Sequence, residues 1–141
     1  MRQGFSIVEL VLVVAVASLL LGIALPQLSG ALDRIEVSAA ANHLAAAHQR
    51  ARMMAIARSQ VLVLSVDPAR LAIYPRGQST LRWTEEGPAA SSVVLAGPAR
   101  QFTFSPEGLT LGLSNATLRL ARGSASRTVV VSRLGRVRIA R

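Results

Sequence analysis

The sequence contains no cysteine and very few aromatic residues. The absence of cysteine excludes a disulfide framework, a thiolate zinc or iron–sulfur site and a thiol nucleophile. Aromatic residues make up only 4% of the chain, so no aromatic platform for stacking nucleic-acid bases is expected. Because 51% of the 141 residues are hydrophobic, the chain can still build a core, and disordered, coiled-coil or collagen-like classes are excluded.

Negative charge is also scarce in this sequence. Seven acidic residues stand against 16 basic ones, all of them arginine, and the formal net charge is +9. GC-rich codon usage is one explanation for arginine in place of lysine, but arginine binds phosphate in a bidentate manner whatever selected it. The composition therefore favours an anionic partner.

The residue patterns of catalytic and metal sites are missing as well. His43 and His48 are five residues apart on a predicted helix, about 140° around its axis, so they cannot bind one metal ion together. Both are expected to be solvated or half-packed. The only adjacent carboxylates, Glu85 and Glu86, lie in a turn-like segment and are expected to be solvated. Without an acid/base pair, a glycine-rich phosphate loop or a G-x-S-x-G motif, the sequence predicts no enzyme, no metal and no cofactor.

A long apolar run lies near the amino terminus, from Ile7 to Leu25, interrupted only by Glu9, Ser18 and Gly22. As a helix, the uncharged part from Leu10 to Leu25 would cover ~24 Å of the ~30 Å hydrocarbon layer. Residues 5–9 would supply the remaining length. We therefore expect residues 5–29 to form a transmembrane helix.

A secretory signal peptide is the alternative interpretation of the same run. Arg2 would form its basic region and Ser29-Gly30-Ala31 its cleavage site, releasing a basic domain that begins near Leu32. Two features count against it. Glu9 would lie inside the apolar region, and the run exceeds the roughly 7 to 15 residues of such regions.

Helical periodicity continues beyond the apolar run. After Pro26, Leu28, Leu32, Ile35 and Ala39 recur at spacings of four, three and four, and a second stripe runs from Ala40 to Met54. The pattern predicts one helix from Phe5 to about Arg58. Because proline removes a backbone donor and clashes with the preceding turn, a kink is expected at Pro26.

Beyond Ser59 the hydrophobic period changes from helical to two, which is typical of strands. Turn residues such as Asp67-Pro68, Gly97-Pro98 and Gly123-Ser124 separate the segments. The predicted strands are Val61–Val66, Leu71–Tyr74, Leu81–Trp83, Val93–Leu95, Phe102–Phe104, Leu109–Leu113, Thr117–Leu120, Thr128–Ser132 and Arg136–Ile139. The sequence thus predicts an α+β fold, with one or two antiparallel sheets packed on the second half of the helix.

The most specific motif is Gly4-Phe5-Ser6-Ile7-Val8-Glu9-Leu10, after a short leader that contains Arg2. It resembles the class III signal of type IV pilins and type II secretion pseudopilins. The resemblance implies that a prepilin peptidase removes residues 1–4 by cleaving between Gly4 and Phe5, and that the new terminal Phe5 is methylated.

Glu9 has a physical role in such a helix. A carboxylate within the bilayer costs on the order of 2.5 kcal/mol at depth, so it needs a partner. The natural partner is the positively charged amine of Phe5 on a neighbouring, staggered subunit. In the family that the motif resembles, this glutamate is linked to assembly with other pilin subunits.

The resemblance extends over the whole chain. Pro26, the alanine-rich second half-helix, the segment Phe102–Gly108 and the final Gly135-Arg136-Val137-Arg138 resemble the H-type minor pseudopilins, the GspH/FimT family. This implies a type IV pilin-like fold, anchored by inner-membrane lipid of a Gram-negative bacterium, with residues 30–141 as a periplasmic domain. The carboxyl-terminal disulfide of many major pilins has no counterpart here, which favours a minor subunit.

The carboxyl-terminal tail is strongly basic, because no acidic residue follows Glu107. On a strand, Arg136 and Arg138 would lie on one face ~7 Å apart, while Val137 and Ile139 face the core and Gly135 relaxes the preceding turn. The tail resembles that of FimT-type members, whose G-R-x-R motif is associated with DNA binding in natural transformation. The predicted DNA-binding residues are Arg133, Gly135, Arg136, Arg138 and Arg141.

Two functions remain open at this stage. The first is a minor pilin whose tail binds double-stranded DNA without sequence specificity, since phosphate contacts carry no sequence information. The second is a type II secretion pseudopilin that acts in protein export, with the arginines forming only a solvated edge-strand face. The sequence leaves the neighbouring subunits, a position at the filament tip and the order of the strands undetermined.

Overall fold

A computed structural model describes residues 6–112, 115–132 and 134–140. The first element is the helix α1 (Ile7–Ala57), and a short 3-10 helix, η1 (Pro88–Ser91), follows between two strands. The strands are β1 (Leu62–Val66), β2 (Arg70–Pro75), β3 (Trp83–Glu86), β4 (Val94–Ala96), β5 (Arg100–Phe104), β6 (Thr110–Leu111), β7 (Ala116–Arg122), β8 (Ala125–Val131) and β9 (Val137–Ala140).

The chain divides into two compact units, Met1–Leu32 and Asp33–Arg141. In the first unit, every described residue up to Ser29 is exposed. The helix contains one segment that is long and apolar enough to cross a membrane. It continues through Pro26 as predicted, while the kink at that residue remains a prediction.

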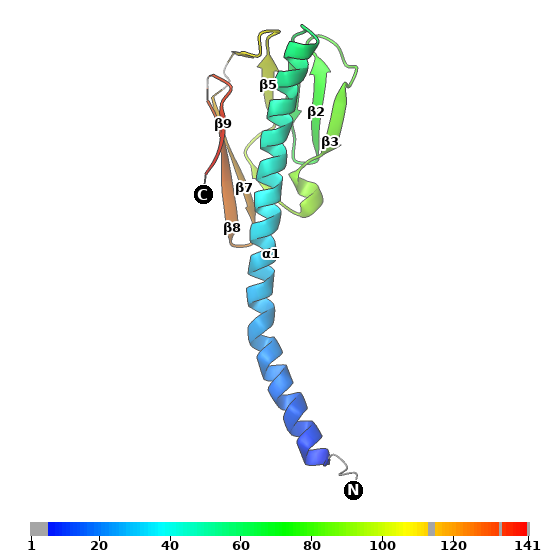
Figure 1. Ribbon diagram of the computed structural model, residues 1–141, viewed down its shortest axis with the longest axis vertical. Helices are drawn as coiled ribbons and strands as arrows, with labels where there is room; N and C mark the ends of the chain where they lie inside the picture. The colour runs from blue at the N-terminus through cyan, green and yellow to red at the C-terminus, as the bar shows by residue number, and fades with distance from the viewer. Residues whose placement is uncertain (1–5, 113–114, 133, 141) are drawn as a thin grey trace. The chain divides into compact units, whose positions relative to one another are not determined.

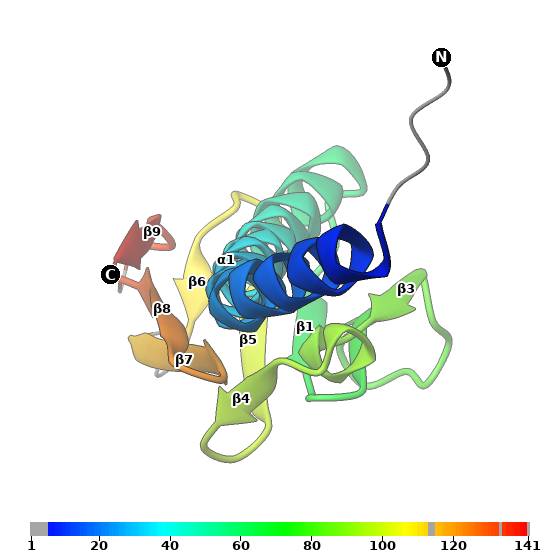
Figure 2. The ribbon, with the colours of Figure 1, turned by 90° about the horizontal axis from the view of Figure 1, so that it is seen from below.

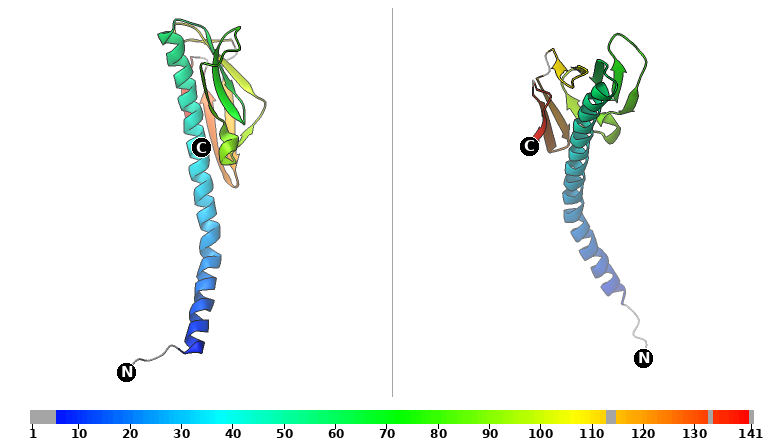
Figure 3. Two further views of the ribbon diagram at one scale, coloured as in Figure 1. Left: turned by 90° about the vertical axis from the view of Figure 1, so that its right-hand side faces the viewer. Right: turned by 45° about the horizontal axis from the view of Figure 1, so that its top comes forward.

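The second unit packs the carboxyl-terminal part of α1 against the strands. The buried residues of this part are Val37, Ala41, Leu44, Ala47, His48, Ala51 and Ala55. Most of them are alanine, and such small side chains allow the helix backbone to approach a sheet closely. Both sheets lie on the same side of this part of the helix (Figures 1 and 3).

All strand pairs are antiparallel, and they form two sheets. The five-stranded sheet has the order β3-β2-β1-β5-β6 and the four-stranded sheet the order β4-β7-β8-β9. The chain enters the second sheet at β4, returns to the first for β5 and β6, and then completes the second. Strand β3 of the first sheet and strand β9 of the second lie at opposite ends of the two sheets taken together (Figure 2). The predicted α+β fold is confirmed.

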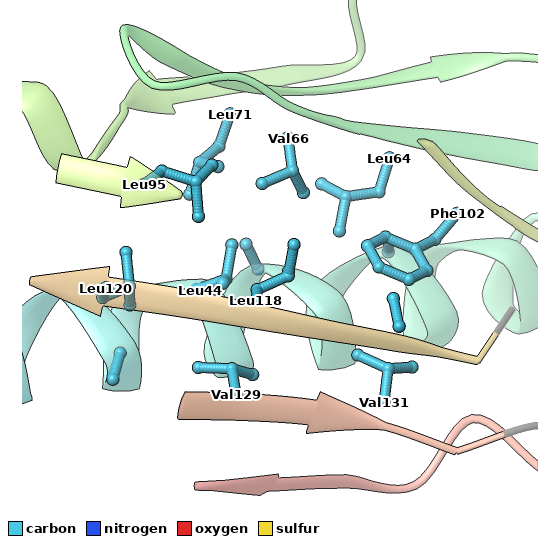
Figure 4. Close-up of a cluster of buried hydrophobic side chains, with 14 of the residues drawn as sticks. Leu44, Leu64, Val66, Leu71, Leu95, Phe102, Leu118, Leu120, Val129 and Val131 are labelled. Atoms are coloured by element: carbon cyan, nitrogen blue, oxygen red, sulfur yellow. The ribbon is translucent and has the colours of Figure 1, made fainter. Parts of the chain in front are cut away.

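One hydrophobic core joins the helix to both sheets. Leu64, Val66 and Phe102 from the five-stranded sheet face Leu118 and Val131 from the four-stranded sheet (Figure 4). Alternate residues of β7 and β8 point into this core, as expected for strands with one solvated face. The residues between them therefore form the outer surface of the four-stranded sheet.

Two sequence predictions about the β3 segment were wrong in detail. Glu85 and Glu86 lie on β3 and not in a turn, because their strand pairs with β2 from Ile73 to Arg70. Strand β3 was expected to start at Leu81 but starts at Trp83. The hydrophobic period does not reveal that β3 is a paired edge strand, because its residues are mostly exposed. The period does not reveal η1 either.

His48 was also predicted wrongly, as a solvated or half-packed residue. Its side chain is only 2% exposed and lies edge-on to Phe102 and Phe104, with ring centroids 5.5 and 4.9 Å away. Both of its ring nitrogens are buried without a hydrogen-bond partner among the described residues. Burial, assisted by the charge of Arg52, lowers the pKa of His48 to about 4, so the ring is neutral near pH 7.

Candidate functional site

The amino-terminal candidate residues are only partly described by the structure. Gly4 and Phe5 lie outside the described residues. Glu9 lies in the first turn of α1 and is exposed. A carboxylate is favourable there, because the helix amino terminus carries partial positive charge.

Large apolar side chains surround Glu9 along the helix. Leu10, Val11, Val14 and Leu21 are among the many that are more than half exposed in the first unit. Such a continuous apolar surface is far larger than soluble monomers normally expose, which indicates a membrane or protein partner for this segment.

The basic tail ends in strand β9, at the edge of the four-stranded sheet. The turn between β8 and β9 is closed by hydrogen bonds from the Gly135 N–H to the Ser132 carbonyl (3.0 Å) and from the Ser132 N–H to the Arg136 carbonyl (2.9 Å). Gly135 has a φ of +71°, which favours glycine, and it is buried with its Cα facing Thr110. Gly135 therefore lies in the turn before β9 with a backbone conformation that suits glycine, while its role in presenting the two arginines stays a prediction.

Arg136 and Arg138 are both exposed, as predicted, but only Arg138 lies within β9. Val137 packs partly against the core. Ile139 was predicted to face the core as well, and it lies on the core side because it pairs with the buried Val129. It is still 37% exposed, because β9 is the edge strand of the four-stranded sheet among the described residues. Arg133 and Arg141 lie outside the described residues.

Arg122, which belongs to the same basic tail, is held by an ion pair. Its Nε lies 3.0 Å from Oδ1 of Asp33, and its Nη1 donates a hydrogen bond to the Ser91 carbonyl. The neighbouring Gly123 (φ +53°) contacts the same carboxylate so closely that a Cβ atom would collide with it. This contact fixes the β7–β8 hairpin to α1 and removes Arg122 from the free positive charge of the tail.

Arg119 was not predicted as a site residue, but it lies on the surface that carries Arg138. It is exposed on β7 between the buried Leu118 and Leu120. The sequence places Arg119 in a strand, but only the pairing of β7 with β8 and of β8 with β9 shows that it shares a face with Arg138.

A separate hollow of about 200 Å³ lies between α1 and the β3–η1 segment. His43 and Glu85 meet at it, with Nδ1 and Oε1 3.4 Å apart and both side chains largely exposed. Among the described residues, no group of three or more histidine, aspartate or glutamate side chains could hold a metal ion.

The chain is similar to several pilin-related proteins. A family model described as type II transport protein GspH matches residues 40–135. The pilin-like protein PilA1 of Thermus thermophilus is 32% identical over 156 residues, an alignment that covers 98% of each chain.

Solved structures show the same fold. The crystal structure of the type IV minor pilin FimU from Pseudomonas aeruginosa matches with a TM-score of 0.63 and 19% identity, covering 77% of this chain and 90% of FimU. A second crystal form of FimU matches with a TM-score of 0.58 and 17% identity, covering 74% of this chain and 92% of FimU. This chain therefore has the fold of a type IV pilin and belongs to the GspH family of pilin-like proteins, whose members are structural subunits and not enzymes.

Proposed function

We propose that this subunit binds double-stranded DNA without sequence specificity through its carboxyl-terminal arginines, as part of a type IV pilus that takes up DNA in natural transformation. The observation that carries the proposal is the segment Gly135-Arg136-Val137-Arg138, which presents two exposed guanidinium groups at a sheet edge. In this proposal, residues 5–29 anchor the chain in the inner membrane of a Gram-negative bacterium, and residues 30–141 lie in the periplasm.

The charge around this segment suits a polyanion. Asp33, the carboxylate that pairs with Arg122, lies on α1, and no acidic residue follows Glu107 in the sequence. Successive positions on one face of a strand are ~7 Å apart, a spacing that allows Arg136 and Arg138 to contact neighbouring phosphates. Contacts of this kind release counterions and give affinity that falls steeply with salt.

A salt titration with duplex DNA tests the proposal. Replacing Arg136 and Arg138 with glutamine removes about two phosphate contacts, so the slope of log affinity against log salt should flatten by ~1.8. Affinity should fall by at least about a hundredfold at low salt, equally for unrelated sequences, because each charged hydrogen bond contributes on the order of 1.5 kcal/mol or more. The matched control replaces Arg70 and Arg76, two exposed arginines in and after β2, and should bind like wild type.

Processing is proposed between Gly4 and Phe5, by a prepilin peptidase that requires a small residue before the cut. Gly4→Val should therefore leave an unprocessed precursor in the membrane, and mass spectrometry of the wild type should show Phe5 as an N-methylated terminus. A mature terminus at Leu32 would instead indicate a secretory signal peptidase.

Assembly is proposed to depend on Glu9, whose carboxylate pairs with the Phe5 amine of a neighbouring subunit. Glu9→Leu should insert into the membrane at least as well as wild type, because it removes a costly charge, but should be absent from sheared filaments. Equal incorporation of both variants would show that the carboxylate is not needed for docking.

The alternative is an H-type pseudopilin that acts in type II protein export without binding DNA, as the description of the matching family model suggests. In that case the wild type would bind duplex DNA no better than the Arg136/Arg138 double variant across the salt titration. Deletion of the gene would then impair export of folded proteins and leave transformation unchanged.

A further inference from the structure

The outer surface of the four-stranded sheet carries one arginine, Arg119, that does not belong to the segment Gly135-Arg136-Val137-Arg138. The strand register aligns Arg119 on β7 with Thr128 on β8 and Ala140 on β9. It likewise aligns Thr117 with Val130 and Arg138. Because residues paired across a ladder point to the same side, Arg119 and Arg138 share one face.

This outer sheet face, formed by the outward positions of β4, β7, β8 and β9, suits a flat anionic partner. Apart from Arg119 and Arg138, its outward positions carry only alanine, serine, threonine and valine. No carboxylate lies on this face among the described residues, so nothing there repels phosphate or competes for the guanidinium groups. The side chains are short, so the two arginines rise above them.

The other arginines of β7 and β8 do not offer a free guanidinium group on this face. Arg122 is engaged by Asp33 and Ser91. Arg127 pairs with the buried Leu120 and so points to the inner side, where its Nη1 donates to the Ser126 carbonyl. Within the described residues, Arg119 makes no hydrogen bond or ion pair in the subunit itself, and its guanidinium is therefore available to a ligand.

The spacing between Arg119 and Arg138 differs from the spacing between Arg136 and Arg138, so the two pairs can contact different phosphates. Arg119 lies two strands away from Arg138 and two residues along, which places their Cα atoms ~12 Å apart, against ~7 Å between Arg136 and Arg138. The shorter spacing allows contact with phosphates of one strand. The longer one is comparable to the ~12 Å width of the major groove of B-DNA, which separates phosphates of opposite strands.

We infer that Arg119 contacts the second strand of a duplex held by Arg136 and Arg138, and so makes this subunit prefer double-stranded over single-stranded DNA. The inference rests on the proposed DNA binding and adds to it a residue that determines specificity for the duplex. The DNA then lies across β7, β8 and β9 and not only along the sheet edge.

The test uses the full chain in a neutral detergent and a fluorescent 30-mer, supplied as duplex or as single strand, in fluorescence anisotropy titrations over a range of salt. For Arg119→Gln, duplex affinity should fall about tenfold and the salt slope should flatten by ~0.9. Single-strand affinity should stay within twofold of wild type. Arg100→Gln, at an exposed arginine of β5 in the other sheet, removes the same charge and should change neither.

Arg119→Lys guards against a merely structural effect, because it keeps the charge and should retain most of the duplex salt slope. The inference is overturned if Arg119→Gln behaves like Arg100→Gln, or if it weakens single-strand and duplex binding equally, while the Arg136/Arg138 variant still loses binding. If the wild type binds neither form of DNA, the proposed function itself fails.

Discussion

The two halves of α1 are both apolar, yet they are apolar in different ways. From Ile7 to Leu25 the helix carries mostly leucine, valine and isoleucine, and all of these side chains are exposed. From Asp33 to Ala57 alanine is the most frequent residue, and the buried residues form one stripe against the two sheets. The amino-terminal half has apolar side chains all round, whereas the second half has one apolar face.

This difference shows what each half needs from its surroundings. Large aliphatic side chains that no other described residue covers need apolar surroundings outside the subunit, of the kind that a membrane or neighbouring subunits offer. Alanine contributes little buried area of its own, but it lets the larger side chains of the sheets, such as Leu64 and Phe104, reach the helix. The first half is thus stabilised by partners and the second by the domain itself.

The largest expected difference in the free energy of unfolding is between two leucine-to-alanine variants, one in the core of the domain and one in the amino-terminal half of α1. Leu64→Ala should lower the free energy of unfolding of the domain by about 2–5 kcal/mol, because Leu64 is 0% exposed and its loss leaves a cavity. Leu20→Ala, at a residue that is 62% exposed, should leave that free energy unchanged. Urea unfolding of the full chain in detergent, followed by the fluorescence of Trp83, measures both. Equal effects would show that the two halves are not energetically distinct.

The second prediction is that the free energy of unfolding depends on pH through His48, which is buried in the packed half of α1. The pKa of His48 is lowered to about 4 by burial, with a smaller contribution from Arg52, whereas an unfolded histidine titrates near 6.5. Between these values the unfolded chain binds a proton that the native chain does not. The contribution of neutral His48 is therefore complete above about pH 6.5 and is lost as the pH falls toward 4, by on the order of 3 kcal/mol.

His48→Leu is the matched variant for this pH dependence. It removes the two buried nitrogens that lack partners, so it should be at least as stable as wild type at pH 7. Its free energy of unfolding should change less than that of wild type between pH 6.5 and pH 4. Parallel pH profiles for both proteins would assign the loss to other groups.

The third prediction adds volume where the helix meets the sheets. Ala51→Leu should lower the free energy of unfolding by about 1–3 kcal/mol, because Ala51 is fully buried and the added atoms have no space. Ala46→Leu, on the exposed side of the same helix, should change it by less than about 0.5 kcal/mol. Thermal unfolding by circular dichroism distinguishes the two, and equal melting temperatures would show that the interface can expand.

The smallest effect is expected within the second unit, where its first residue, Asp33, pairs with Arg122. Both side chains are partly solvated, so Asp33→Asn should lower the free energy of unfolding by only about 1 kcal/mol, and less at high salt. The same urea titration at low and high salt measures it. A loss that does not depend on salt would indicate that packing against Gly123, and not charge, holds the hairpin.

Much of the fold could be predicted from local patterns. The change from helical to two-residue periodicity at Ser59, and the turn residues between segments, located the helix and each strand to within a few residues. His48 was misjudged because its two neighbours in the core, Phe102 and Phe104, are more than fifty residues away in the chain. Glu85 and Glu86 were misjudged because an edge strand with exposed side chains lacks a hydrophobic period.

The sequence by itself determined that this chain has an apolar amino-terminal helix, a β-rich remainder and a basic carboxyl-terminal segment, because those properties depend on composition and on neighbours in the chain. Only the tertiary structure decided which arginines share a surface. Pairing of β7, β8 and β9 brings Arg119 to the face of Arg138, while Asp33 on the distant helix neutralises Arg122. Strand register and ion pairing join residues that are far apart in sequence, so no local pattern encodes them visibly.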